Sequence, residues 1–113
     1  MRIESTSIKE VKIINPQLHR DERGCFFESY KPNFNHGNGL PSNFVQENQV
    51  QSKKGVIRGL HYQLNKPQGK LVRVVVGTIL DVAVDIRVGS PTFGEYIIVE
   101  LSGENNKMIY VPE

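Results

Sequence analysis

Three side chains suited to proton and anion chemistry lie close together in the middle of this 113-residue chain. Arg58 and His61 belong to the run RGLHYQ, and Lys70 follows the segment LNKPQG. An imidazole can take up a proton near neutral pH, which suits His61 to the role of a general base. The residues alone leave a second interpretation open, in which His61 is a buried, hydrogen-bonded core histidine and the two cations lie at strand ends.

The spacing of this cluster makes a structural demand. Strict alternation along a strand would place Arg58 and His61 on opposite faces. They share a face only if a bulge interrupts the strand, and Gly59 is the residue that could form one. No metal site is expected, because the residue two positions after His61 is Gln and the other two histidines, His19 and His36, stand in polar turns.

Two carboxylates, Asp81 and Asp85, lie on the same face of the apolar run from residue 79 to residue 87. Asp85 could orient an imidazole by a hydrogen bond. The alternative is a strand-end salt bridge of Asp85 with Arg87 or Arg73. The single cysteine, Cys25, has no adjacent histidine, so neither a thiolate nucleophile nor an internal disulfide is expected.

The composition favours strands as the elements that position these side chains. The chain has 13 Val and 10 Ile, against 7 Leu and a single Ala. β-Branched residues suit strands, whereas helices prefer Ala and Leu. A helical bundle and a doubly wound α/β fold are therefore excluded, and the length predicts one domain over residues 1–113.

Strand-like runs alternate with turns along the whole chain, which predicts an antiparallel sandwich or barrel. A turn is expected at 21–24, a hairpin around Gly77 and Thr78, and a loop from Pro32 to Pro41 with at most one short turn of helix. The predicted strands cover residues 11–14, 25–30, 44–51, 56–63, 71–76, 79–88, 96–101 and 108–111.

Charge and hydropathy exclude several partners. The net charge is only +2, and the longest basic run is Lys53-Lys54, so nucleic acid is not expected. A small positive balance suits a small molecule that carries phosphate. No apolar run has the length of a signal peptide or a bilayer span, which predicts a cytoplasmic protein without a membrane partner.

Taken in order, the motifs resemble those of the dTDP-4-dehydrorhamnose 3,5-epimerase family. The resemblance extends from about residue 10 to the last residue, with compatible spacing. The matching segments are DERGCFFESY (21–30), FVQEN (44–48), RGLHYQ (58–63), QGKLVR (68–73), DVAVDIR (81–87) and GSPTFG (89–94).

The resemblance implies an antiparallel cupin-type jelly-roll barrel, a homodimer with exchanged N-terminal strands, no cofactor and no metal. It implies epimerisation at carbons 3 and 5 of dTDP-4-dehydro-6-deoxy-D-glucose, which gives dTDP-4-dehydro-L-rhamnose. His61 matches the base, Lys70 the group that stabilises the enolate, and Arg58 a cation that binds substrate. The positions that match nucleotide-sugar contacts are Arg23, Glu28, Gln46, Glu47 and Asn48, with Phe26 as a surface on which the thymine ring could stack.

In the family the chain continues beyond the position of Val111-Pro112-Glu113, into a Gly-Phe-Ala-His-Gly-Phe segment. It then supplies a tyrosine acid and an aspartate that pairs with the base. The resemblance therefore identifies these residues as the N-terminal part of such a barrel, incomplete at the C-terminal end, and turnover by 113 residues alone is not implied. Two other functions stay open: an epimerase that acts at carbon 3 or carbon 5 only, and a non-catalytic jelly roll that binds nucleotide sugars.

Overall fold

The computed structural model describes residues 1–32 and 39–113. Within these residues all regular elements are strands, and every pairing is antiparallel, which confirms the all-β prediction. No helix in the described part of the chain is long and apolar enough to cross a bilayer. The strands are β1 (Arg2–Ser5), β2 (Lys12–Asn15), β3 (His19–Asp21), β4 (Gly24–Phe26), β5 (Lys70–Arg73), β6 (Thr78–Val84), β7 (Tyr96–Ser102) and β8 (Met108–Val111).

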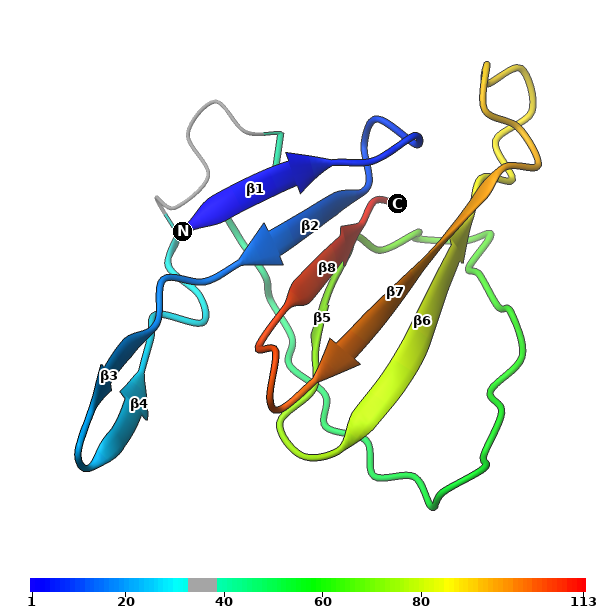
Figure 1. Cartoon of the computed structure of the whole chain (residues 1–113). Helices are drawn as coiled ribbons and strands as arrows, with labels where there is room; N and C mark the ends of the chain where they lie inside the picture. Colours follow the sequence, from blue (N-terminus) through cyan, green and yellow to red (C-terminus); the bar gives the residue numbers. More distant parts are fainter. Residues whose placement is uncertain (33–38) are drawn as a thin grey trace.

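The largest sheet joins the two ends of the chain. Its strand order is β1-β2-β8-β5, so the N-terminal β2 pairs with the C-terminal β8 (Figure 1). The register aligns Ile14 with Met108 and Leu71 with Tyr110. We call this the main sheet. Strand β1, which the sequence did not predict, forms its edge beside β2.

Each face of the main sheet has its own apolar core. One face looks toward the β6–β7 hairpin, and we call it the inner side; the opposite face is the outer side. The inner core consists of Ile8, Val11, Ala83, Val99, Leu101 and Ile109, with Val72 and Val111 packed against it. The outer core consists of Ile14, Met108 and Tyr110, and it is covered by Leu40 and Phe44.

The predicted hairpin around Gly77 and Thr78 is wrong. Strand β5 pairs with β8 in the main sheet, whereas β6 pairs with β7 in a separate hairpin. Gly77 does turn the chain, with a φ of 85°, but the turn carries it from one sheet to the other. Gly103 brings it back, and its amide donates a hydrogen bond of 3.1 Å to the carbonyl oxygen of Gly77. Two crossings in contact therefore form the corner between the sheets.

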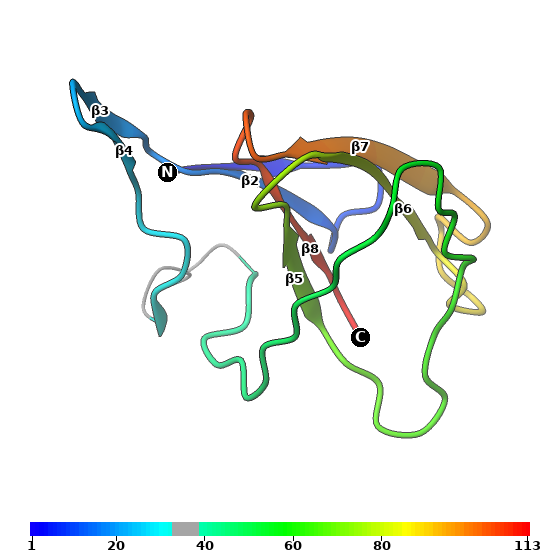
Figure 2. The ribbon, with the colours of Figure 1, turned by 90° about the horizontal axis from the view of Figure 1, so that it is seen from below.

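Two further predicted strands, 44–51 and 56–63, have no partner in the described part of the chain. Phe44, at the start of this segment, still covers the outer core. Beyond it the segment joins neither sheet and runs as a long loop, which we call the looping segment (the green trace in Figure 2). Val45 and Ile57 are 91% and 92% exposed there. An apolar alternating run becomes a strand only where another strand satisfies its backbone groups, and none lies alongside. The bulge expected at Gly59 therefore has no ladder to interrupt.

The shorter predictions have mixed outcomes. The turn at 21–24 is confirmed, and Gly24 takes the expected positive φ, 135°. The predicted strand 25–30 ends at Phe26. The predicted strand 108–111 matches β8 residue for residue. The loop expected from Pro32 to Pro41 lies largely outside the described residues.

Candidate active site

His61 lies on the looping segment with an exposed side chain. Its Nδ1 atom is 3.1 Å from the carbonyl oxygen of Gly59. A carbonyl oxygen can only accept a hydrogen bond, so this contact requires the proton on Nδ1. The neutral ring then presents the lone pair of Nε2 to solvent. This is the tautomer that a general base needs, and it is held by the backbone two residues earlier.

Arg58 lies on the same segment but points to another partner. Its Nε and Nη2 atoms donate to the hydroxyl oxygen of Ser52, at 3.2 and 3.1 Å. The amide of Val56 also bonds to the carbonyl of Lys53, so residues 52–58 form a local turn. Arg58 and His61 make no hydrogen bond to each other, and the cluster expected from their spacing is not assembled by direct contacts.

Lys70 is positioned by the main sheet rather than by the looping segment. It opens β5 and pairs with Val111 of β8. The next residue, Leu71, packs against the outer core, so alternation turns Lys70 to the inner side. Its side chain is half-buried and makes no hydrogen bond or ion pair with the described residues. An unpaired ammonium group at the edge of an apolar core is suited to bind a developing negative charge.

The glycine before Lys70 is set by a close approach that the sequence did not reveal. A Cβ atom on Gly69 would lie 2.9 Å from the hydroxyl oxygen of Tyr110 and 3.2 Å from its Cε2 atom. Tyr110 packs in a row of three edge-on rings. Its ring centroid is 6.5 Å from that of Phe44, whose centroid is 5.5 Å from that of Tyr30. Gly69 therefore lets β5 enter the sheet beneath the Tyr110 ring.

Gly69→Ala is expected to lower the free energy of unfolding by about 1–3 kcal/mol, because the added methyl group overpacks the Tyr110 ring. Gly59→Ala is the matched control, since a Cβ there meets nothing within 4 Å. Removing the nearest atom by Tyr110→Phe should recover part of the loss in the double variant. Urea unfolding of the wild type, the three single variants and the double variant measures these free energies. Equal losses of unfolding free energy in Gly69→Ala and Gly59→Ala would contradict the prediction.

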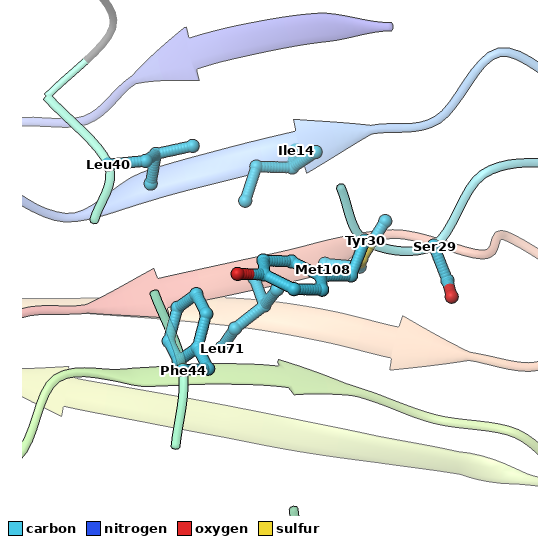
Figure 3. A pocket seen from close by; sticks show the side chains of 7 residues that line it. All are labelled: Ile14, Ser29, Tyr30, Leu40, Phe44, Leu71 and Met108. Carbon is cyan, nitrogen blue, oxygen red and sulfur yellow. The ribbon is translucent and has the colours of Figure 1, made fainter. Parts of the chain in front are cut away.

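The rings of Tyr30 and Phe44 also line an apolar recess on the outer side of the main sheet (Figure 3). The Tyr30 hydroxyl donates to the carbonyl of Ser42 at 3.0 Å, which closes the segment over the recess. No charged side chain lines it, so its role is packing. Its lining residues are Ile14, Ser29, Tyr30, Leu40, Phe44, Leu71 and Met108.

The β3–β4 hairpin projects from the end of the main sheet, away from the looping segment (Figures 1 and 2). Phe26 is 68% exposed on it, and its ring centroid is 6.4 Å from that of His19. At the turn, Nη2 of Arg23 lies 2.6 Å from Oδ2 of Asp21, and this guanidinium lowers the pKa of the Asp21 carboxyl. The exposed ring of Phe26 and the guanidinium of Arg23 thus lie on a hairpin that projects away from the looping segment.

The remaining expected contact residues are exposed and locally paired. Glu28 lies 3.4 Å from the ammonium group of Lys31. The side-chain amide of Gln46 donates to Oδ1 of Asn48 at 3.0 Å, and Glu47 between them is exposed. No group of three or more His, Cys, Asp or Glu side chains in the described ranges is arranged to hold a metal ion.

The structure gives Asp85 the salt bridge that the sequence left open. Its side chain is buried and receives both arms of the Arg87 guanidinium, Nε at 2.9 Å and Nη2 at 2.8 Å. The hydroxyls of Ser90 and Thr92 each donate to Oδ2 at 2.6 Å. Arg87 also reaches Glu10 at 3.0 Å, which ties the β6–β7 loop to the chain before β2. Asp85 does not contact His61.

These hydrogen bonds, above all those from Arg87 and then those from Ser90 and Thr92, hold the pKa of Asp85 far below its ordinary value. A depressed folded-state pKa stabilises the fold above the unfolded-state pKa of about 3.9, and the stabilisation is lost as the pH falls below it. Asp85→Asn is therefore expected to melt well below the wild type at pH 7. The difference in melting temperature between the two proteins should narrow progressively below about pH 4.

Thermal melts between pH 7 and pH 2.5 test this expectation. Asp21→Asn is the control, because Asp21 has the same kind of arginine partner on an exposed turn, where such a pair contributes little. A gap between wild type and Asp85→Asn that stays constant with pH would show that the carboxylate charge is not what stabilises this loop.

The comparisons with known proteins agree with these motifs. The family model described as dTDP-4-dehydrorhamnose 3,5-epimerase matches residues 5–113. A curated protein of that name from Methanothermobacter thermautotrophicus is 49% identical over 112 residues, which is 99% of this chain and 60% of that protein. The chain thus spans about three fifths of that relative's length.

Solved structures extend the likeness to the fold. The dTDP-6-deoxy-D-glucose-3,5-epimerase RmlC of Legionella pneumophila, in complex with dTDP-4-keto-L-rhamnose, matches with a TM-score of 0.93 and 50% identity over 99% of this chain and 60% of that one. ChmJ, a 3'-monoepimerase from Streptomyces bikiniensis in complex with dTDP-quinovose, matches with a TM-score of 0.85 and 34% sequence identity. The match covers 96% of this chain and 56% of that one. The antiparallel sheets are those of a cupin-like jelly roll, as predicted. This chain belongs to the dTDP-4-dehydrorhamnose 3,5-epimerase family.

Proposed function

We propose that this protein inverts carbons 3 and 5 of dTDP-4-dehydro-6-deoxy-D-glucose and gives dTDP-4-dehydro-L-rhamnose, without a metal or cofactor. Family membership supports the reaction class. The observation that carries the proposal is the His61 ring, whose Nδ1 donates to the Gly59 carbonyl and leaves Nε2 free as a base. We further propose that the reaction serves L-rhamnose synthesis, that the protein acts in the cytoplasm, and that residues 1–113 belong to a single domain.

The chemistry proceeds by removal of a proton next to a ketone. Nε2 of His61 takes the proton from the sugar carbon, and the electron pair of that C–H bond moves into the ketone to form an enolate. The ammonium group of Lys70 stabilises the negative oxygen. A second proton, supplied by solvent water, is then added to the opposite face of the same carbon and the ketone reforms, while His61 releases the proton that it took to solvent. Repetition at the second carbon completes the product.

Substrate binding uses the exposed polar residues around this centre. Arg58 binds a negatively charged part of the nucleotide sugar, and its only partner in the described residues is a neutral hydroxyl, which a phosphate can displace. The ring of Phe26 stacks on the thymine base. The further nucleotide-sugar contacts are Arg23, Glu28, Gln46, Glu47 and Asn48.

A homodimer brings the residues of the β3–β4 hairpin together with those of the looping segment and Lys70. The β3–β4 hairpin projects away from the looping segment that carries His61 (Figure 1). Arg23 and Phe26 on this hairpin would therefore reach the site of a second copy. The far face of the β6–β7 hairpin also exposes Leu80 and Ile98, at 68% and 56%, which is apolar area that an interface would cover.

Incubating the natural gene product with dTDP-4-dehydro-6-deoxy-D-glucose in heavy water tests the function. Deuterium at carbons 3 and 5 is the expected result. Deuterium at only one carbon would make the protein a single-site epimerase, the activity named for ChmJ. A non-catalytic binding module is the second candidate, because no direct contact joins Arg58, His61 and Lys70. dTDP binding seen by calorimetry without any deuterium incorporation would favour it. If neither deuterium incorporation nor dTDP binding is seen, both the epimerase and the binding module are overturned.

A further inference from the structure

Three aromatic rings from distant parts of the chain meet over the outer core. Tyr30 follows the β3–β4 hairpin, Phe44 stands where the looping segment leaves the outer core, and Tyr110 belongs to β8. The rings of Tyr30 and Phe44 are close to perpendicular, at 82°, and those of Phe44 and Tyr110 meet at 76° (Tyr30 and Phe44 are labelled in Figure 3). Edge-on rings at these distances attract each other beyond their apolar contact. We call these three residues the ring row.

Phe44, in the middle of the ring row, attaches the looping segment to the rest of the fold. Its side chain is half-buried against the outer core. The next residue, Val45, is 91% exposed, and Gln46, Glu47 and Asn48 are exposed as well. The only hydrogen bond that these three polar side chains make with described residues joins Gln46 to Asn48. Phe44 is therefore their nearest attachment to the sheets.

The other two members of the ring row restrain Phe44 from both sides. Tyr110 is buried on β8, which lies between β2 and β5 in the main sheet. The Tyr30 hydroxyl donates a hydrogen bond of 3.0 Å to the carbonyl oxygen of Ser42, two residues before Phe44. The Phe44 side chain is thus held by two rings, and the backbone that leads to it is held by a hydrogen bond.

The ends of the ring row lie next to residues of the proposed site. At one end, the Tyr110 hydroxyl comes so close to Gly69 that an added Cβ would lie 2.9 Å from it, and Gly69 directly precedes Lys70. At the other end, Tyr30 lies two residues after Glu28. The ring row therefore runs from the segment of an expected nucleotide-sugar contact to the strand that carries the expected enolate-stabilising group.

Covering the outer core does not by itself require aromatic rings. Leu40 and Ile3 cover the same core as aliphatic side chains. Edge-on rings add a preferred direction, and the Tyr30 hydroxyl adds a directed hydrogen bond. A fixed direction matters where polar side chains a few residues further along the chain must meet a ligand in one geometry.

We propose that Phe44 is a positioning residue for nucleotide binding, which fixes the start of the looping segment and thereby presents residues 46–48 to the nucleotide sugar. The inference rests on the proposed function for the identity of the ligand, but not for the anchoring of the segment. Contacts that are ordered before binding spare the free energy of ordering them on binding. Because nucleotide contacts are alike in the ground state and the transition state, weakening them should raise KM and leave kcat nearly unchanged.

¹⁵N relaxation of the natural gene product tests the anchoring without any ligand. In Phe44→Ala the amide order parameters of residues 46–48 should fall to about 0.6 or lower, the range of flexible backbone. Tyr30→Phe keeps all three rings and removes only the hydrogen bond to Ser42, so it should stay folded and show a smaller fall. Val45→Ala is the matched control, because Val45 adjoins Phe44 but is exposed, and it should leave the order parameters of residues 46–48 unchanged.

The anchoring is overturned if the order parameters of residues 46–48 in Phe44→Ala and Tyr30→Phe equal those of the wild type. If Phe44→Ala does not fold, Tyr30→Phe alone decides between the two outcomes.

Calorimetry with dTDP and deuterium incorporation test the positioning role. Phe44→Ala is expected to raise both the dissociation constant of dTDP and the KM of the substrate roughly 10-fold, with kcat within about twofold of the wild type. Phe44→Leu, which still covers the outer core, should recover part of the affinity, and Val45→Ala should bind normally. A variant that is only partly folded would instead lose kcat and keep its KM, and that result would overturn the positioning role.

The outcomes separate this inference from the proposed function. A dissociation constant for dTDP that is unchanged in Phe44→Ala overturns the positioning role and leaves the proposed function standing. A tenfold weaker affinity in Phe44→Ala, with no deuterium incorporation in the wild type, supports the positioning role and counts against the proposed function alone. A wild type that binds no dTDP overturns both, and the relaxation data still decide whether Phe44 anchors the segment.

Discussion

His61→Ala is expected to lower the rate of deuterium incorporation into dTDP-4-dehydro-6-deoxy-D-glucose by roughly 10²- to 10⁴-fold, the usual contribution of a positioned general base. The loss should appear in kcat, because the base acts in the proton-transfer step. The ring is exposed and contributes little to the fold, so the variant should stay folded. Nε2 is the atom without a partner, and no other described side chain on the looping segment supplies an imidazole.

His61→Asn separates the base from the hydrogen bond that orients it. The amide nitrogen of asparagine can still donate to the Gly59 carbonyl, as Nδ1 of His61 does, but it has no basic atom. We expect it to be as slow as His61→Ala. Tyr62→Phe, a change at the exposed neighbouring residue, is the control and should exchange normally. Exchange at the wild-type rate in His61→Ala would remove His61 from the mechanism.

Gly103→Ala is expected to cost about 3 kcal/mol of the free energy of unfolding, the upper end of what overpacking usually costs. A Cβ atom there would lie 2.5 Å from the carbonyl oxygen of Val75 and 3.2 Å from its carbonyl carbon. Both atoms belong to the backbone, so no side chain can move aside. Relief requires the two sheet crossings to separate, which breaks the bond from Gly103 to Gly77.

Gly94→Ala is the matched control for this substitution. Gly94 lies in the turn at the other end of the β6–β7 hairpin, with a φ of 82° and nothing within 4 Å of an added Cβ. Gly103 has no positive φ, so Gly94→Ala gives the cost of a left-handed backbone alone, about 1 kcal/mol or slightly more, which the clash at Gly103 should exceed. Urea unfolding compares the two. A loss in Gly103→Ala no larger than that in Gly94→Ala would show that the corner accommodates the methyl group.

The pairings of the strands show where the sequence stops being informative. The run 71–76 and the run 79–88 were both predicted to be strands, and their β character is confirmed in β5 and β6. Their mutual pairing was wrong, because an alternating pattern specifies a strand and its buried face but not its partner. β5 pairs with a strand almost forty residues later in the chain, and only the packing of the two sheets selects it.

The candidate site divides in the same way. The sequence singled out His61, Lys70 and Arg58 by residue type and by motif. It did not distinguish the orienting role of Asp85 from a salt bridge, and the structure decides for Arg87, only two residues away. The close contact of Gly69 with Tyr110 has no signal in the pattern, since it joins residues about forty positions apart.

By itself, the sequence determined the all-β class, the family and the residue types of the candidate chemistry, because β-branched content, turn glycines and motif spacing are local properties. The tertiary structure alone decided that three aromatic rings meet over the outer core, that the His61 segment joins neither sheet, and that the chain changes sheet at Gly77 and Gly103. These outcomes depend on which faces are buried against each other, and that depends on contacts between distant parts of the chain.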